Sequence, residues 1–163
     1  MRSCPPFQSD RFPTLRIAYE GSPQTARSAR GSLKDALDRW GVPFNIHAED
    51  LLMSVHEAVS NAWRHGSQQT PGRPIRMVAI CVELPELNGR KAAHKITVAI
   101  SDTGEGFDTS APLRVEMLDG EGNEVHACGR FLMSKGCDSV EYCRQDGWFT
   151  CILEKTLPTF RAE

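Results

Sequence analysis

The chain has 163 residues, of which 40% are apolar and 25% are charged, a composition typical of a globular protein with one core. Its 19 basic and 21 acidic side chains give a net charge of −2, whereas nucleic-acid-binding proteins normally carry a basic excess. No apolar run approaches the roughly 20 residues of a membrane span, and the N-terminus does not resemble a signal peptide. We therefore expect one domain over residues 12–157, with an N-terminal tail at 1–11 and a C-terminal tail at 158–163.

The six cysteines form no CxxC pair and no spacing typical of a metal site. Several lie in apolar runs, where a thiol behaves as a small hydrophobic group. This favours a reduced, cytoplasmic setting, although an even number of cysteines leaves disulfides open. His56-Glu57 matches the start of the zinc-protease motif HExxH, but Ser60 stands where the second histidine would be, so that zinc site is not expected.

The first third of the chain predicts a strand followed by a helix. Residues 14–19 alternate between apolar and polar, as a half-buried strand does. Ser22-Pro23 supplies an N-cap and a proline suited to the first helical position, which predicts a helix from there to about Trp40. Gly41 should end it, and residues 45–50 should connect it to the next helix.

Residues 51–66 are predicted to be a helix, because they are rich in apolar residues and contain no proline. One stripe along this helix is polar and recurs at three- and four-residue steps: Ser54, Glu57, Asn61 and His65. An apolar stripe lies about half a turn away: Leu52, Val55, Val59 and Ala62. Taken alone, this pattern is explained most simply by a solvated amphipathic helix.

The remainder of the chain predicts four strands and one short helix after a polar loop. The strands are expected at 75–84, 95–100, 139–144 and 148–155, and the helix at 129–136. Asn88-Gly89 should turn the first two of these strands into a hairpin. Helices grouped before hairpin-connected strands predict an α+β fold, a two-layer sandwich in which a mostly antiparallel sheet is covered by helices on one face.

Two glycine-containing stretches have residue types suited to a ligand site. Asp102, Gly104 and Gly106 form a DxGxG pattern at the expected end of a strand. A carboxylate fixed there can accept a hydrogen bond from an amine such as that of adenine, and the glycines would let a flat ligand approach the backbone. An ordinary turn uses the same residue types. Gly129 precedes the short helix, whose N-terminal N–H groups and dipole favour an anion.

In this order the stretches resemble the motifs of the histidine-kinase-like ATPase (GHKL) superfamily. Its N box and its two glycine boxes correspond here to Glu57-x-x-x-Asn61, Asp102-x-Gly104-x-Gly106 and Gly129–Met133. The chain is most similar to the short anti-sigma-factor serine/threonine-protein kinases, whose N box runs similarly over 57–66 and which likewise carry the Asp-x-Val of 138–140. The resemblance covers residues 14–155 and implies the Bergerat-type ATP-binding fold.

The resemblance also implies ATP and Mg²⁺ as cofactors and assigns roles to single residues. Glu57 would be the general base, Asn61 would coordinate Mg²⁺, and Asp102 would bind the adenine amine. The residues implied in ATP binding are Asn61, Asp102, Gly104, Gly106, Gly129, Arg130 and Thr150. Residues 107–128 would form the ATP lid, in which Arg114, like Arg130 beyond it, could neutralise phosphate charge.

The second glycine box departs from the family pattern Gly-x-Gly-Leu, because Ala127 replaces the first glycine and Arg130 replaces the leucine. Gly136 occupies a position that is usually apolar, where glycine weakens a helix by roughly 1 kcal/mol relative to alanine. These departures favour nucleotide binding over efficient turnover. His65 is expected to cap or pack at its helix end, and the three tryptophans are expected in the core: Trp40, Trp63 and Trp148.

The function implied by the resemblance is an ATP-dependent kinase that phosphorylates an anti-anti-sigma partner of the STAS type and sequesters a sigma factor. Such a partner switch would regulate transcription as a homodimer, without contacting nucleic acid or a membrane. A catalytically weak or inactive regulator of the same fold, which acts by binding alone, is the alternative; the altered glycine box favours it and the intact Glu57 favours the kinase. A two-component sensor is less consistent, because the segment before the N box is too short for a phospho-acceptor hairpin. P-loop and protein-kinase motifs are absent from the sequence.

Overall fold

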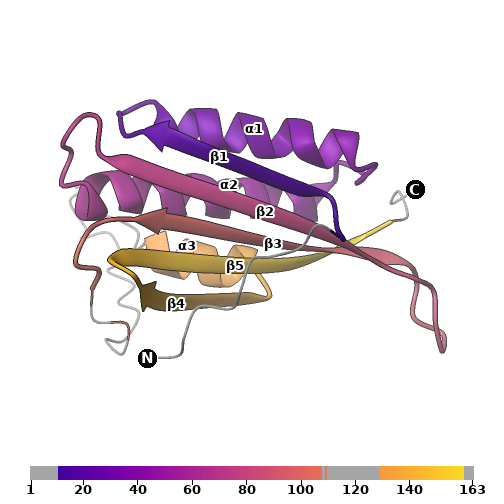
Figure 1. Cartoon of the computed structure of the whole chain (residues 1–163). Helices are drawn as coiled ribbons and strands as arrows, with labels where there is room; N and C mark the ends of the chain where they lie inside the picture. The colour runs from indigo at the N-terminus through magenta and orange to yellow at the C-terminus, as the bar shows by residue number, and fades with distance from the viewer. Residues whose placement is uncertain (1–10, 108, 110–128, 160–163) are drawn as a thin grey trace, which may run out of the picture.

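The computed structural model describes residues 11–107, 109 and 129–159. Its elements, in chain order, are β1 (Thr14–Glu20), α1 (Thr25–Arg39), α2 (Ile46–Asn61), a π-helical turn η1 (Ala62–Gly66), β2 (Pro74–Leu84), β3 (Ala93–Asp102), α3 (Gly129–Gly136), β4 (Ser139–Gln145) and β5 (Trp148–Pro158) (Figure 1). The predicted order of strands and helices is confirmed. None of the described helices is long and apolar enough to cross a membrane.

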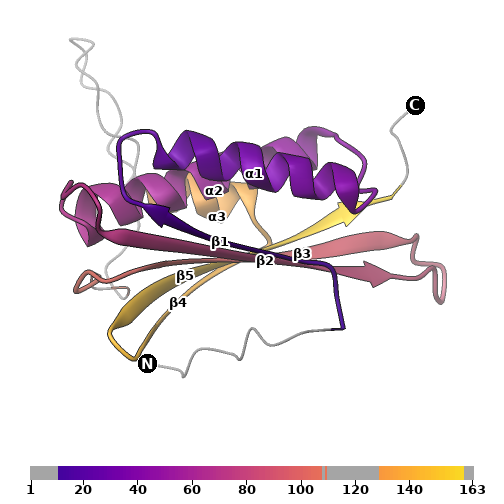
Figure 2. The ribbon, with the colours of Figure 1, turned by 45° about the horizontal axis from the view of Figure 1, so that its top comes forward.

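The five strands form one antiparallel sheet in the order β1-β2-β3-β5-β4. Figure 2 shows α1, α2 and α3 together on one face of this sheet. The α+β two-layer sandwich is therefore confirmed. Because β3 is the central strand, its last residue, Asp102, lies at the middle of one end of the sheet.

The core lies between the helices and the covered face of the sheet. The predicted apolar stripe of α2 is fully buried: Leu52, Val55, Val59 and Ala62 are at most 5% exposed. Opposite them, the sheet contributes side chains such as Met77, Ile100 and Leu153, which are at most 1% exposed. The packing of this stripe fixes which face of α2 points away from the sheet.

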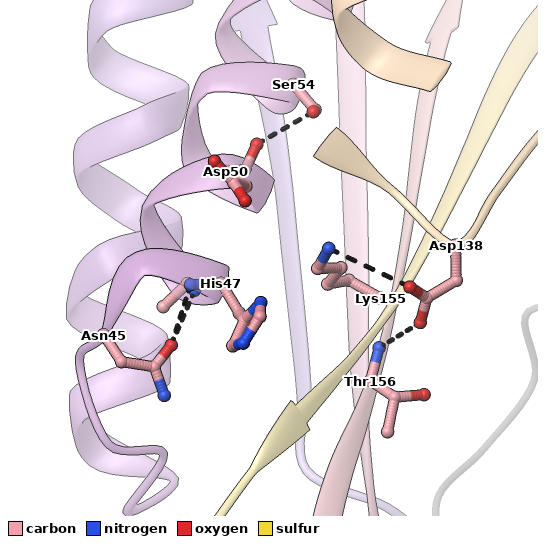
Figure 3. Close-up of polar contacts among 8 residues, drawn as sticks. Asn45, His47, Asp50, Ser54, Asp138, Lys155 and Thr156 are labelled. Atoms are coloured by element: carbon pink, nitrogen blue, oxygen red, sulfur yellow. Dashed lines mark hydrogen bonds and ion pairs between the residues drawn. The ribbon is translucent and has the colours of Figure 1, made fainter. Parts of the chain in front are cut away.

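The starts of both long helices differ from the prediction. The α2 helix begins at Ile46 rather than residue 51, because the side-chain oxygen of Asn45 accepts from the backbone N–H groups of His47 (2.9 Å) and Ala48 (3.1 Å) (Figure 3). Ser22 is not an N-cap; its backbone N–H donates to the Thr25 hydroxyl, and α1 begins only at Thr25.

The last turn of the predicted helix is π-helical rather than α-helical. After Asn61 the helix widens into η1, where the Ser67 N–H donates to the Ala62 carbonyl at 2.7 Å, five residues back. The wider turn ends at Gly66, which lies directly against the carboxylate of Asp102. The contact between these two residues comes from the fold and not from helical periodicity.

Two of the three tryptophans follow the prediction. Trp40 and Trp63 are partly buried and pack on the core. Trp148 does not, because it lies on the face of β5 that carries no helix and stacks with the guanidinium of Arg76, 3.7 Å from the ring centre.

The Asp-x-Val segment leads from α3 into β4 and lies at the end of α2 that is remote from Asn61 (Figure 3). The Asp138 N–H donates to the Glu154 carbonyl at 2.8 Å, and the Asp138 carboxylate accepts from the Thr156 N–H at 2.6 Å. Its other oxygen lies 3.9 Å from the ammonium of Lys155, which is 8% exposed. Asp138 therefore has a structural role in anchoring the start of β4.

Candidate functional site

A cavity of about 640 Å³ opens where α2 and η1 meet the ends of β3 and β5 and the start of α3. Its volume falls in the range of small-molecule sites. Both apolar and polar residues line it: Ala58, Asn61, Ala62, Arg64, His65, Gly66, Ile100, Asp102, Gly106, Phe107, Gly129, Arg130 and Phe149. The structure thus brings together residues from all three sequence motifs.

The Asp102 carboxylate is 6% exposed and lines this cavity. One of its oxygens accepts a hydrogen bond from the Gly104 N–H at 2.8 Å. Burial raises the pKa of Asp102, while the Gly104 hydrogen bond and the nearby Arg144 act in the opposite direction. A buried carboxylate is costly unless donors satisfy it, so this group is suited to accept from a ligand.

Three glycines allow the chain to pack closely around Asp102 and its sheet neighbour Phe149. A Cβ on Gly66 would overlap the Asp102 carboxylate, and a Cβ on Gly104 would lie 2.5 Å from the Cα of Gly66. Gly106 has φ +78°, and a Cβ there would lie 2.5 Å from Cδ2 of Phe149. Glycine is required at each position, which explains the DxGxG spacing and gives Gly66 a role that the sequence did not assign.

The N box and the second glycine box meet at the start of α3. A Cβ on Gly129 would lie 3.0 Å from Oε2 of Glu57 and 3.1 Å from Nδ2 of Asn61. Asn61 lines the cavity, while Glu57 lies half-buried beside it on the same helix. In the described residues no cluster of three or more His, Cys, Asp or Glu side chains could hold a metal ion. A metal here would take Asn61 as its protein ligand, and it would depend on oxygen atoms of a bound ligand and on water.

Gly136 and Ser54 hold the other end of α3 against α2. Ser54 is 2% exposed and donates from its hydroxyl to the Asp50 carbonyl at 2.8 Å (Figure 3). The Ser54 hydroxyl fills the space that a Cβ on Gly136 would need, and that Cβ would also lie 2.9 Å from the Asp50 carbonyl oxygen. Gly136 therefore permits the close packing of α3 on α2, in addition to its effect on helix propensity. Ser54 belongs to this contact between the helices and does not line the cavity.

Thr150 is not brought into the cavity. It follows Phe149, which lines the cavity, and successive side chains of a strand point to opposite faces of the sheet. The hydroxyl of Thr150 lies 2.8 Å from that of its neighbour Ser101, on the face without helices. The expected contact of Thr150 with adenine is therefore not supported by this geometry. Arg114, Ala127 and most of the expected lid lie outside the described residues.

The cavity also contains residues to which the sequence analysis gave no part in ligand binding. Arg64 and His65 line it from η1. Phe149 pairs with Asp102 across β3 and β5, and Phe107 lies with its ring centre 5.3 Å from that of Phe149. The register that brings Phe149 beside Asp102 depends on strand pairing between distant segments, for which the sequence contained no local signal.

A helix-covered antiparallel sheet, with a buried carboxylate ending its central strand and a helix N-terminus across the cavity, defines a domain of the Bergerat-type sandwich class. Residues 19–153 match the family model described as the histidine kinase-like ATPase domain, and the chain belongs to this family. A search of curated proteins finds no match.

Among solved structures, the fold is similar to "The crystal structure of the RsbU and RsbW domains of Rv1364c from Mycobacterium tuberculosis", with a TM-score of 0.56 and 17% sequence identity. The match covers 90% of this chain and 33% of that one, so this chain spans about a third of its neighbour. At 17% sequence identity, this structural similarity shows that the two proteins share a fold.

Proposed function

We propose that the chain binds ATP, with Mg²⁺, in the cavity between α2, β3 and α3. The observation that carries this proposal is the buried Asp102 carboxylate in the cavity wall, with Asn61 and the start of α3 at Gly129 lining the same cavity. The carboxylate would accept from the adenine amine, and the N–H groups that begin α3 would face the phosphates. Membership of an ATPase family supports the same ligand.

We further propose that the chain is a serine/threonine-protein kinase. Glu57 lies one helical turn before Asn61, and both approach Gly129 from the same side. Phosphoryl transfer depends mainly on positioning and electrostatic stabilisation, so a carboxylate there could orient and deprotonate an acceptor hydroxyl while Asn61 holds the metal. The acceptor would be a serine or threonine of an anti-anti-sigma protein of the STAS type.

In its other state the chain would sequester a sigma factor, as a homodimeric partner switch in the cytoplasm. Two observations support this regulatory role: the N box resembles that of anti-sigma-factor kinases, and the fold is similar to a structure that contains an RsbW domain. The alternative, a regulator that acts by binding alone, is favoured by Arg130, whose side chain occupies part of the cavity wall where the family has leucine.

The two functions are separated by measuring transfer of label from γ-labelled ATP to an anti-anti-sigma protein encoded beside this chain. We expect Glu57→Gln to abolish transfer while ATP affinity is kept, because the amide cannot act as a base. Glu86→Gln, on an exposed residue of the β2–β3 hairpin, is the matched control and should transfer normally. ATP binding without transfer by the unaltered protein would instead support regulation by binding alone.

A further inference from the structure

The side chain of Arg130 is held against aromatic rings at the wall of the cavity. Its guanidinium carbon lies 5.0 Å from the ring centre of Phe107 and 5.8 Å from that of Tyr142. Its Nη2 donates to the carbonyl of Thr109 at 3.2 Å. Contacts of this kind stabilise a guanidinium group in a defined place, here beside the loop that follows Asp102.

Of these two rings, that of Phe107 lines the same cavity as Asp102. The Phe107 ring makes edge contacts with Tyr142, at 4.9 Å between ring centres, and with Phe149, at 5.3 Å. Phe149 is the residue that pairs with Asp102 in the sheet, and both line the cavity. The guanidinium of Arg130 thus lies against Phe107, whose ring contacts that of Phe149, the partner of Asp102 in the sheet.

The helix geometry directs Arg130 away from Glu57 and Asn61. The Cα–Cβ direction of Gly129 points at Glu57 and Asn61, as the short distances from a Cβ placed there show. With 3.6 residues per turn, the next residue of α3 is rotated by about 100° around the helix axis. Arg130 therefore leaves the helix on a different side from the one that faces Glu57 and Asn61.

We propose that Arg130 contacts the nucleoside part of the bound nucleotide and is not a partner of the phosphates. This inference rests on the proposed binding of ATP, and it replaces the charge-neutralising role expected for Arg130. A planar guanidinium can stack on a purine as it does on an aromatic side chain, and its N–H groups can donate to a ribose hydroxyl.

The test compares dissociation constants of adenosine, ADP and ATP for the unaltered chain, Arg130→Met and Lys135→Met. Lys135 is an exposed cation of the same helix that does not line the cavity, so its variant controls for the change in charge. We expect Arg130→Met to weaken all three ligands by the same factor, roughly 5- to 30-fold. The dependence of ATP affinity on salt should not change, and Lys135→Met should bind like the unaltered chain.

A loss that grows from adenosine to ATP would make Arg130 a phosphate partner and would overturn the inference. Unchanged affinity for all three ligands in Arg130→Met would overturn it as well. If the unaltered chain bound none of them, the proposed ATP site itself would be wrong. The failure of the two proposals can therefore be told apart.

Tyr142 provides a second measurement, because it contacts Arg130 and Phe107 but does not line the cavity. We expect Tyr142→Leu to weaken adenosine binding, since the guanidinium loses one of its supporting rings. Tyr142→Phe keeps the ring and should bind normally. The effect of Tyr142→Leu should disappear when it is combined with Arg130→Met; an equal effect in both backgrounds would show that the ring does not act through Arg130.

Discussion

The buried carboxylate of Asp102 can be tested with the substitution Asp102→Asn. Asparagine has nearly the same shape, and its side-chain oxygen can still accept the hydrogen bond from Gly104, which is 2.8 Å long in this structure. The loop should therefore keep its conformation. The variant loses the negative charge and one acceptor oxygen, and gains an NH₂ group that cannot accept from an adenine amine.

Ligand affinity and stability should respond in opposite directions. A hydrogen bond to a charged group contributes about 1.5–3 kcal/mol, so the dissociation constant of ATP should rise about 10- to 150-fold. Burial raises the pKa of Asp102, which means that the ionised carboxylate destabilises the folded state at neutral pH. Asp102→Asn should therefore unfold at the same denaturant concentration as the unaltered chain, or at a higher one.

The difference in stability should also depend on pH. Above the raised pKa of Asp102 the unaltered chain bears the full cost of its buried charge. As the pH falls through that pKa the folded state takes up a proton, and below the ordinary pKa of an aspartate the cost is absent. The stability gained by Asp102→Asn at pH 7 should therefore shrink as the pH falls toward 4.

Calorimetric titration with Mg²⁺-ATP and urea unfolding at several pH values measure these effects. Asp146→Asn is the control, because Asp146 is an exposed turn residue with φ +52°, a conformation that asparagine tolerates. Unchanged ATP affinity in Asp102→Asn would refute the assignment of Asp102 to adenine. Strong destabilisation of Asp102→Asn at pH 7 would refute the inference that the buried charge of Asp102 destabilises the folded state.

Two further substitutions test single contacts. Gly106→Ala should destabilise the fold by more than 1 kcal/mol and weaken ATP binding, because φ is +78° and the new methyl group would overlap Phe149. Gly147→Ala, at φ +80° with no atom within 4 Å, measures the backbone strain alone and should spare ATP binding; an equal loss of ATP binding in both variants would contradict this. Asn45→Ala removes the N-cap of α2 and should lower the free energy of unfolding by about 1 kcal/mol, which lowers Tm by about 2–4 °C. ATP affinity should be kept, because the cap lies at the end of α2 that is remote from Asn61.

Much of the fold could be predicted from local patterns in the sequence. The alternation in the strands, the apolar stripe of α2 and the turn residues at 88–89 each act over a few residues, and each appears in the structure. The sequence pattern predicts the start of α2 five residues late, because the cap at Asn45 precedes the apolar period and Ile46 in its first turn is 68% exposed. Local signals thus predicted the elements well and their ends less well.

The candidate site shows the same division between local and tertiary information. The spacing of Glu57 and Asn61 places them one helical turn apart, and the DxGxG pattern places Asp102 at a strand end. The resemblance implies that Thr150 binds ATP, yet the pleat of β5 turns it to the face opposite the cavity, where it meets Ser101. An offset of one residue along a strand moves a side chain to the opposite face of the sheet, and a family resemblance does not specify the strand register.

The sequence by itself therefore determined the α+β class, the order of the elements and the identity of Asp102, Glu57 and Asn61 as candidate site residues, because these follow from periodicity and spacing along the chain together with the family resemblance. The tertiary structure alone decided that Gly66 touches Asp102, that Phe149 stands beside it and that Arg130 lies on aromatic rings. Each of these contacts joins segments far apart in the sequence. Their geometry is set by strand register and helix packing, which only the folded chain brings about.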